Sequence, residues 1–141
     1  MKQLALVVVA GLALAACGSS SPTSGEAAAK AQIKSAYEKL FSGQSSVSER
    51  TAVLQNGSRF KPVIQALAGN PLAKNVSVTV SSVTLQGADK AKVVYTVKLG
   101  SAGLPKQNGT AVRQNGTWKV GYASLCRLVA LQGSTPSACK P

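Results

Sequence analysis

The sequence has no histidine and few acidic residues, and these absences limit the chemistry that the protein can perform. Its 141 residues include only four acids, Glu26, Glu38, Glu49 and Asp89, against 16 lysines and arginines, which gives a formal net charge of +12. Histidine is the usual general base near neutral pH and the commonest metal ligand. We therefore expect no metal site and no cofactor, and general acid–base catalysis would depend on one of the four carboxylates.

The first 16 residues have the organisation of a secretory signal peptide. Lys2 precedes an apolar run over residues 4–16, which is shorter than the roughly 20 residues that a membrane-spanning helix needs. The run leads into Leu14-Ala15-Ala16-Cys17, which resembles the lipobox of bacterial lipoproteins. This resemblance implies cleavage before Cys17 and a diacylglyceryl thioether on its sulfur. The alternative is an ordinary signal peptide with an accidental cysteine.

Residues 17–25 are rich in serine and glycine, a composition typical of a flexible tether. We interpret residues 1–16 as the signal peptide, 17–25 as the tether and 26–141 as a single domain. The domain would then be held by lipid at the extracytoplasmic face of the membrane, in the cell envelope. Loss of Lys2 with the signal leaves 15 basic residues and four acids, a net charge of +11.

Lipidation of Cys17 leaves two further cysteines, Cys126 and Cys139. An exported protein lies in an oxidising compartment, which favours a disulfide between them. Two thiols without histidine or a nearby CxxC motif make a poor metal site. A catalytic thiol would have no histidine to activate it. The sequence therefore predicts a Cys126–Cys139 disulfide.

The first half of the domain has helical periodicity. Thr23-Ser24-Gly25-Glu26 matches a capping box and predicts a helix that continues to about residue 42. Ser46-Val47-Ser48-Glu49 matches a second capping box and predicts a short helix. A third helix is expected to begin at Ser58, as its cap, and to end at Gly69.

From residue 76 the apolar residues alternate with a period of two, which predicts strands. Residues 76–85 and 90–99 would pair as a hairpin with Leu85 opposite Ala91. The alternation slips at Ser81-Ser82, as it does where a β-bulge adds one residue and bends a sheet.

Asn115-Gly116 predicts a tight hairpin turn between two more strands, with Arg113 opposite Trp118. The second of these strands would run to Tyr122 with Trp118 and Tyr122 on its inner face. A short helix over residues 124–132, capped by Ser124, is expected to follow.

The predicted fold is α+β, with three N-terminal helices packed on a bent antiparallel sheet of about four strands and a short C-terminal helix. This order resembles the cystatin-like cone of nuclear-transport-factor-2-like and ketosteroid-isomerase-like domains. Residues 26–133 more closely resemble the C-terminal domain of the mycobacterial low-molecular-weight antigen family, on the motifs at 75–80, 92–95, 117–120 and 132–133. That resemblance implies a secreted actinobacterial protein and supports location and fold more than function. The lipobox and the cysteine pair depart from the family pattern.

We predict that Tyr37, Tyr95, Trp118 and Tyr122 line the inside of the cone. Enzymes built on such a cone carry an acid or a histidine there as proton carrier. Glu38 is the only candidate base, and its position favours an exposed helix charge. We therefore expect a non-catalytic binding or interaction module. The alternative is a small-molecule-binding cone or an isomerase-like or dehydratase-like enzyme.

The basic surface predicts attraction to anionic lipid headgroups or cell-wall polymers, in addition to the membrane contact through the lipid anchor. Nucleic acid is disfavoured because no basic motif with stacking aromatic residues is present and the protein is exported. The module could instead bind a partner protein, which the sequence does not identify, or an apolar ligand in the cone. A simple solvated lysine surface is the alternative.

Metabolic labelling with a fatty-acid analogue should mark the wild-type protein and spare the Cys17→Ser variant, because the predicted thioether forms on the Cys17 sulfur. In-gel detection of the label after purification measures this. Equal labelling of the two proteins would contradict lipidation at Cys17.

Overall fold

The structure is a computed structural model that describes residues 24–141. The predicted signal peptide, Cys17 and the capping residue Thr23 lie outside the described residues. Within residues 24–141, no helix has both the length and the hydropathy of a membrane span. The buried hydrophobic side chains of this part, from Ala29 to Val129, form one core cluster.

Three α-helices precede the sheet, as predicted, and two 3₁₀ turns accompany them. Their bounds are α1 Ser24–Phe41, α2 Val47–Val53, η1 Gly57–Phe60, α3 Lys61–Ala68 and η2 Pro71–Asn75. The second capping box is confirmed: Glu49 N donates to Ser46 Oγ over 3.1 Å, and Ser46 N donates to the Glu49 carboxylate over 2.8 Å. The prediction that Ser58 caps the third helix is wrong. Ser58 lies inside η1, and α3 continues from that turn with Pro62 in its first turn, where no hydrogen bond is lost.

The sheet is antiparallel with the order β1-β2-β4-β5, and the two-residue β3 pairs with β2 beyond this path. The strands are β1 Val76–Leu85, β2 Lys90–Leu99, β3 Ala102–Gly103, β4 Gln107–Gln114 and β5 Thr117–Val120. The predicted register is confirmed, with Leu85 opposite Ala91 and a shift between Val80 and Ser82 that marks the bulge. Sequence reasoning missed β3, which is too short to show alternation.

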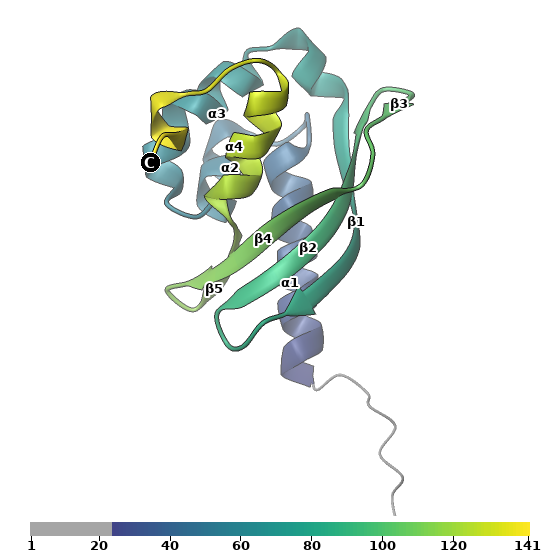
Figure 1. Ribbon diagram of the computed structural model, residues 1–141, viewed down its shortest axis with the longest axis vertical. Coiled ribbons are helices and arrows are strands. Elements are labelled where there is room, and N and C mark those ends of the chain that lie inside the picture. The colour runs from purple at the N-terminus through teal and green to yellow at the C-terminus, as the bar shows by residue number, and fades with distance from the viewer. Residues whose placement is uncertain (1–23) are drawn as a thin grey trace, which may run out of the picture.

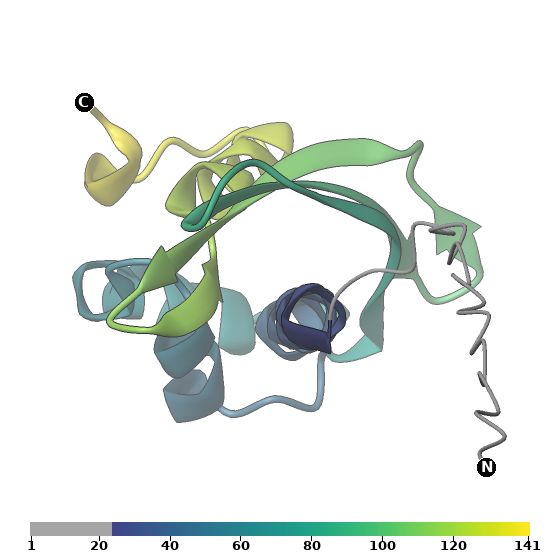
Figure 2. The same ribbon diagram turned by 90° about the horizontal axis from the view of Figure 1, so that it is seen from below.

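The sheet curls around α1, which runs along its concave face (Figures 1 and 2). Alternate residues of β2 point inward and are buried, including Val93 and Tyr95. They meet the apolar stripe of α1, where Ile33, Tyr37 and Leu40 are also buried. The helix therefore fills the space that an open cone would leave.

The β4–β5 hairpin turns at Asn115-Gly116, where both residues have positive φ, 52° and 76°. These values fit the two-residue turn that the Asn-Gly pair predicted, and Arg113 lies opposite Trp118 as expected. The predicted extension of the last strand to Tyr122 is wrong. The strand ends at Val120, and Tyr122 begins helix α4.

Helix α4 spans Tyr122–Leu131 and begins two residues earlier than predicted, with Gly121 rather than Ser124 at its N-cap. Gly121 is close to β4, because its backbone N donates to Thr110 O over 2.8 Å and a Cβ at Gly121 would meet the Thr110 side chain. This hydrogen bond extends the β4–β5 pairing by one residue, and the chain leaves the sheet directly after it, where α4 begins. Ser124 is left inside the helix, where it is buried.

The structure joins Cys126 of α4 to Cys139 of the final turn η3 (Ser137–Cys139), with the sulfurs 2.04 Å apart. The geometry thus agrees with the pairing expected from the cysteine count. The bond joins two residues that are 13 positions apart in the sequence, and it links the C-terminal tail to α4.

Replacing both cysteines by alanine should lower the free energy of unfolding by about 3 kcal/mol, because the unfolded chain regains the entropy that the closed loop removes. Urea denaturation followed by circular dichroism measures this. Adding a thiol reductant should destabilise the wild type to the level of the double variant and leave the variant unchanged. Equal stability of the two oxidised proteins would contradict the prediction.

Candidate functional site

A ring of hydrogen bonds around the buried Tyr37 and Ser124 joins α1, β4 and α4. The Tyr37 hydroxyl donates to Thr110 O over 2.7 Å and lies 3.0 Å from Ser124 Oγ. Thr110 N donates to the same Oγ over 3.1 Å. Since the single proton of Tyr37 is used on Thr110 O, the Ser124 hydroxyl is the donor to Tyr37. Each hydroxyl in the ring therefore both donates and accepts.

This arrangement makes the hydroxyl groups of Tyr37 and Ser124 poor catalytic groups. Burial is the largest influence on Tyr37 and raises the pKa of its hydroxyl far above the ordinary value for tyrosine. Burial also raises the pKa of Tyr95. Both phenols stay protonated near neutral pH, and the Ser124 hydroxyl has no base among its hydrogen-bond partners. The ring serves as a structural joint.

The four aromatic residues predicted to line the cone are not gathered around one space. Tyr37 and Tyr95 pack with ring centroids 5.0 Å apart in the core between α1 and the sheet. Trp118 is buried on the inner face of β5. Tyr122 lies outside the cone, 42% exposed, and stacks on Phe60 with centroids 5.6 Å apart.

Glu38, the candidate base, does not face this interior. Its carboxylate lies 4.0 Å from Lys34 Nζ, one turn earlier on α1, and both side chains are about half exposed. Within residues 24–141, no group of three or more histidine, cysteine or acidic residues is placed to hold a metal ion.

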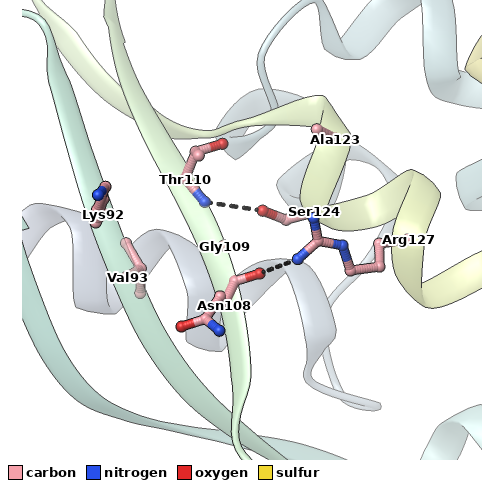
Figure 3. A pocket seen from close by; sticks show the side chains of 8 residues that line it. All are labelled: Lys92, Val93, Asn108, Gly109, Thr110, Ala123, Ser124 and Arg127. Atoms are coloured by element: carbon pink, nitrogen blue, oxygen red, sulfur yellow. Dashed lines mark hydrogen bonds between the residues drawn. The ribbon is translucent and has the colours of Figure 1, made fainter.

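A cleft of about 300 Å³ lies between the sheet and α4 (Figure 3). Its walls come from β2, β4 and the first turns of α4. The lining residues are Lys92, Val93, Asn108, Gly109, Thr110, Ala123, Ser124 and Arg127. The ring of hydrogen bonds closes one side of the cleft, because Thr110 and Ser124 belong to both.

Two cations flank this cleft from opposite sides. Lys92 projects from β2, and Arg127 reaches from α4 to donate to Asn108 O over 2.9 Å (Figure 3). No carboxylate is among the lining residues. A cleft with two cations and no acid favours an anionic group.

Gly109 lets β4 lie close to the core tyrosines at this point. A Cβ at Gly109 would meet the Tyr37 hydroxyl and would lie 2.7 Å from Ser124 Oγ. Sequence reasoning missed Asn108, Thr110 and Arg127 as cleft residues. The one available signal was a glycine inside a strand, which often marks a close approach of another group.

The cleft is at the edge of a larger basic surface. Lys90, Lys92 and Lys98 alternate with the buried residues of β2, so all three point to the outer face of the sheet and are exposed. Exposed serines and threonines of β1 lie beside them, at positions 77, 79, 82 and 84. We call this outer surface of β1, β2 and β4 the sheet face. Figure 1 looks onto it, and no described helix crosses β1 or β2 there.

No acid lies on the sheet face. Glu26 and Glu38 belong to α1, Glu49 starts α2, and Asp89 is in the turn between β1 and β2. Glu26 pairs with Lys30 over 2.9 Å. Asp89 directly precedes Lys90, but no salt bridge of the described residues involves Lys90, Lys92 or Lys98.

These features define an α+β domain in which a curled antiparallel sheet encloses a long helix. A family model described as the low molecular weight antigen MTB12, C-terminal domain, matches residues 26–136, so the chain belongs to this family. No curated protein matches the chain. A solved structure from Nostoc punctiforme, a domain of unknown function with a cystatin-like fold, is similar at a TM-score of 0.43 and 13% identity. The match covers 84% of this chain and 91% of that one.

Tyr37→Phe should lower the free energy of unfolding by about 1–3 kcal/mol, because the Ser124 hydroxyl would lose its buried acceptor. Tyr122→Phe, which changes an exposed tyrosine, should have an effect under about 0.5 kcal/mol. Chemical denaturation of both variants measures the difference. Equal effects would contradict the role of the ring.

Comparison of the wild type with Tyr37→Phe also tests the raised pKa of Tyr37. Tyrosine in the unfolded chain ionises near about pH 10, and the folded pKa of Tyr37 lies above that. Its contribution to stability is therefore complete below about pH 10 and is lost as pH rises further. The wild type should lose stability above pH 10 more steeply than Tyr37→Phe does, and parallel pH profiles would contradict this.

Proposed function

We propose that this protein is a lipid-anchored, non-catalytic module of the cell envelope that uses its sheet face to associate with the anionic headgroups of the membrane. The observation that carries the proposal is the sheet face itself, an exposed surface with three lysines and no acid. The lipobox-like segment and the short tether support a location beside the membrane.

Simple electrostatics gives the expected strength. Each basic residue close to an anionic membrane contributes about 1 kcal/mol, and the attraction extends over about one Debye length, which is roughly 10 Å at 0.1 M salt. The proposed anchor would keep the domain near the surface, so even a weak interaction acts at high effective concentration. The sheet face would then orient the domain on the membrane.

The absence of a placed acid or base supports a non-catalytic role for the described residues. Tyr37 and Tyr95 are held neutral, and Glu38 is paired on the outside of α1. General acid–base catalysis needs a titrating group beside the substrate. The cleft offers Lys92 and Arg127 for binding and no carboxylate for proton transfer.

Residues 24–141, free of lipid and carrying a net charge of +11, should sediment with vesicles of anionic phospholipid at low salt and be released as salt rises. Neutral vesicles should not retain the protein. The triple variant Lys90→Gln, Lys92→Gln, Lys98→Gln should bind anionic vesicles at least tenfold more weakly, since about 1 kcal/mol is lost per lysine.

A matched triple variant separates the sheet face from net charge. Lys39, Lys61 and Lys74 are exposed on the helical elements, and changing them to glutamine removes the same total charge. This variant should lose less than threefold in binding. Equal losses would show that net charge acts without a preferred face. Binding to purified wall polymer but not to vesicles would contradict the membrane as the partner and would indicate the cell wall instead.

A further inference from the structure

A second hollow lies on the opposite side of α4 from the cleft. It is a groove of about 470 Å³ between α3 and the C-terminal tail, and α4 forms part of its floor. This volume is in the range of small-molecule sites. We call it the tail groove. It shares no lining residue with the cleft.

The tail groove is lined mainly by apolar side chains. Val63 and Leu67, four residues apart on α3, form one wall, and the buried Val129 of α4 lies at the floor. Pro136 and Ala138 of the tail form the facing wall. Val63, Leu67 and Ala138 are only half-buried although they pack against the core, so the groove exposes apolar surface that a ligand could cover.

One charged residue lines the tail groove, and it is a cation. Arg59 lies in η1, directly before α3, and its guanidinium lies 5.9 Å from the centre of the Phe60 ring. No acid lines the groove, and the salt bridges of the described residues do not include Arg59. The guanidinium is therefore available to a ligand's anion, and its planar fork matches a carboxylate.

The disulfide places the facing wall of the groove. The backbone hydrogen bonds of the tail stay within it, from Cys139 N to Pro136 O and from Lys140 N to Ser137 O. The Cys126–Cys139 bond adds a covalent cross-link between the end of this segment and α4, beyond the backbone that connects them. Ala138 also packs against the core, so loss of the bond is expected to loosen the position of Pro136 and Ala138 opposite α3.

We propose that the tail groove binds a single-chain fatty acid, with its alkyl chain between α3 and the tail and its carboxylate on Arg59. The apolar lining selects the chain, because burying it removes hydrocarbon surface from water. The lone cation at Arg59 selects an anionic head over a neutral one. The groove is independent of the sheet face, and this proposal does not rest on the proposed function.

Titration of residues 24–141 with dodecanoate, followed by calorimetry and amide NMR shifts, tests the proposal. The experiment is done at 0.3 M salt so that attraction to the exposed lysines is screened. The wild type should bind one dodecanoate and shift the amide signals of α3 and the tail. Dodecanol, which has the same chain and no charge, should bind at least tenfold more weakly.

Three variants locate the site. Arg59→Gln should weaken dodecanoate binding at least tenfold, whereas Arg113→Gln, an equal charge change on β4, should change it less than twofold. The Cys126→Ala, Cys139→Ala variant, checked for folding by circular dichroism, should also bind at least tenfold more weakly. The triple lysine variant of the sheet face should bind dodecanoate like the wild type, which keeps the two sites distinguishable.

Several results would overturn the proposal. Absence of dodecanoate binding would do so, and so would equal effects of Arg59→Gln and Arg113→Gln, which would indicate general attraction to a basic protein. Dodecanol binding as tight as dodecanoate would remove the role of Arg59. Undiminished binding to the folded cysteine variant would show that the tail wall is not part of the site.

Discussion

The hydroxyl of Tyr37 links α1, β4 and α4, and the positions of the cleft and the tail groove depend on these elements. It is donor to β4 at Thr110 and acceptor from α4 at Ser124, and it comes from the helix that fills the curled sheet. A buried hydroxyl is stable only when its hydrogen bonds are made, so the three elements must keep one mutual position. The position of α4 in turn sets the cleft on one side and the tail groove on the other.

The interior between α1 and the sheet is filled by side chains, and the hollows described above lie on the outside of the domain. An open cone would offer an enclosed pocket, but α1 and the tyrosines Tyr37 and Tyr95 occupy that space here. The outer surfaces include an exposed sheet face with lysines and hydroxyl groups, the cleft beside α4 and a groove next to the disulfide-linked tail. Neither the sheet face nor the tail groove has an acidic side chain among its own residues, in keeping with a chain that has only four acidic side chains.

The sequence patterns predicted the helices and strands well where neighbouring residues determine them. The bulge at Ser81-Ser82 and the register of β1 and β2 follow from the period of two, because a slip of one residue would turn the apolar side chains outward. The ring of hydrogen bonds could not be predicted in this way. It joins Tyr37 to residues 73 and 87 positions away in the sequence. Ser124 was predicted to be a helix cap because the sequence does not show that Tyr37, its hydrogen-bond partner, lies beside it. The tail groove likewise depends on where the disulfide places the chain end.

The most direct test of the sheet face is to map, residue by residue, which surface of the folded domain meets an anionic membrane. Amide NMR signals of residues 24–141 would be followed on addition of anionic bicelles, with neutral bicelles as the reference. We expect broadening centred on the β2 amides from residue 90 to residue 98 and on the neighbouring positions of β1. Broadening centred on α1 and α2, with the β2 signals unchanged, would contradict the sheet face as the contact surface.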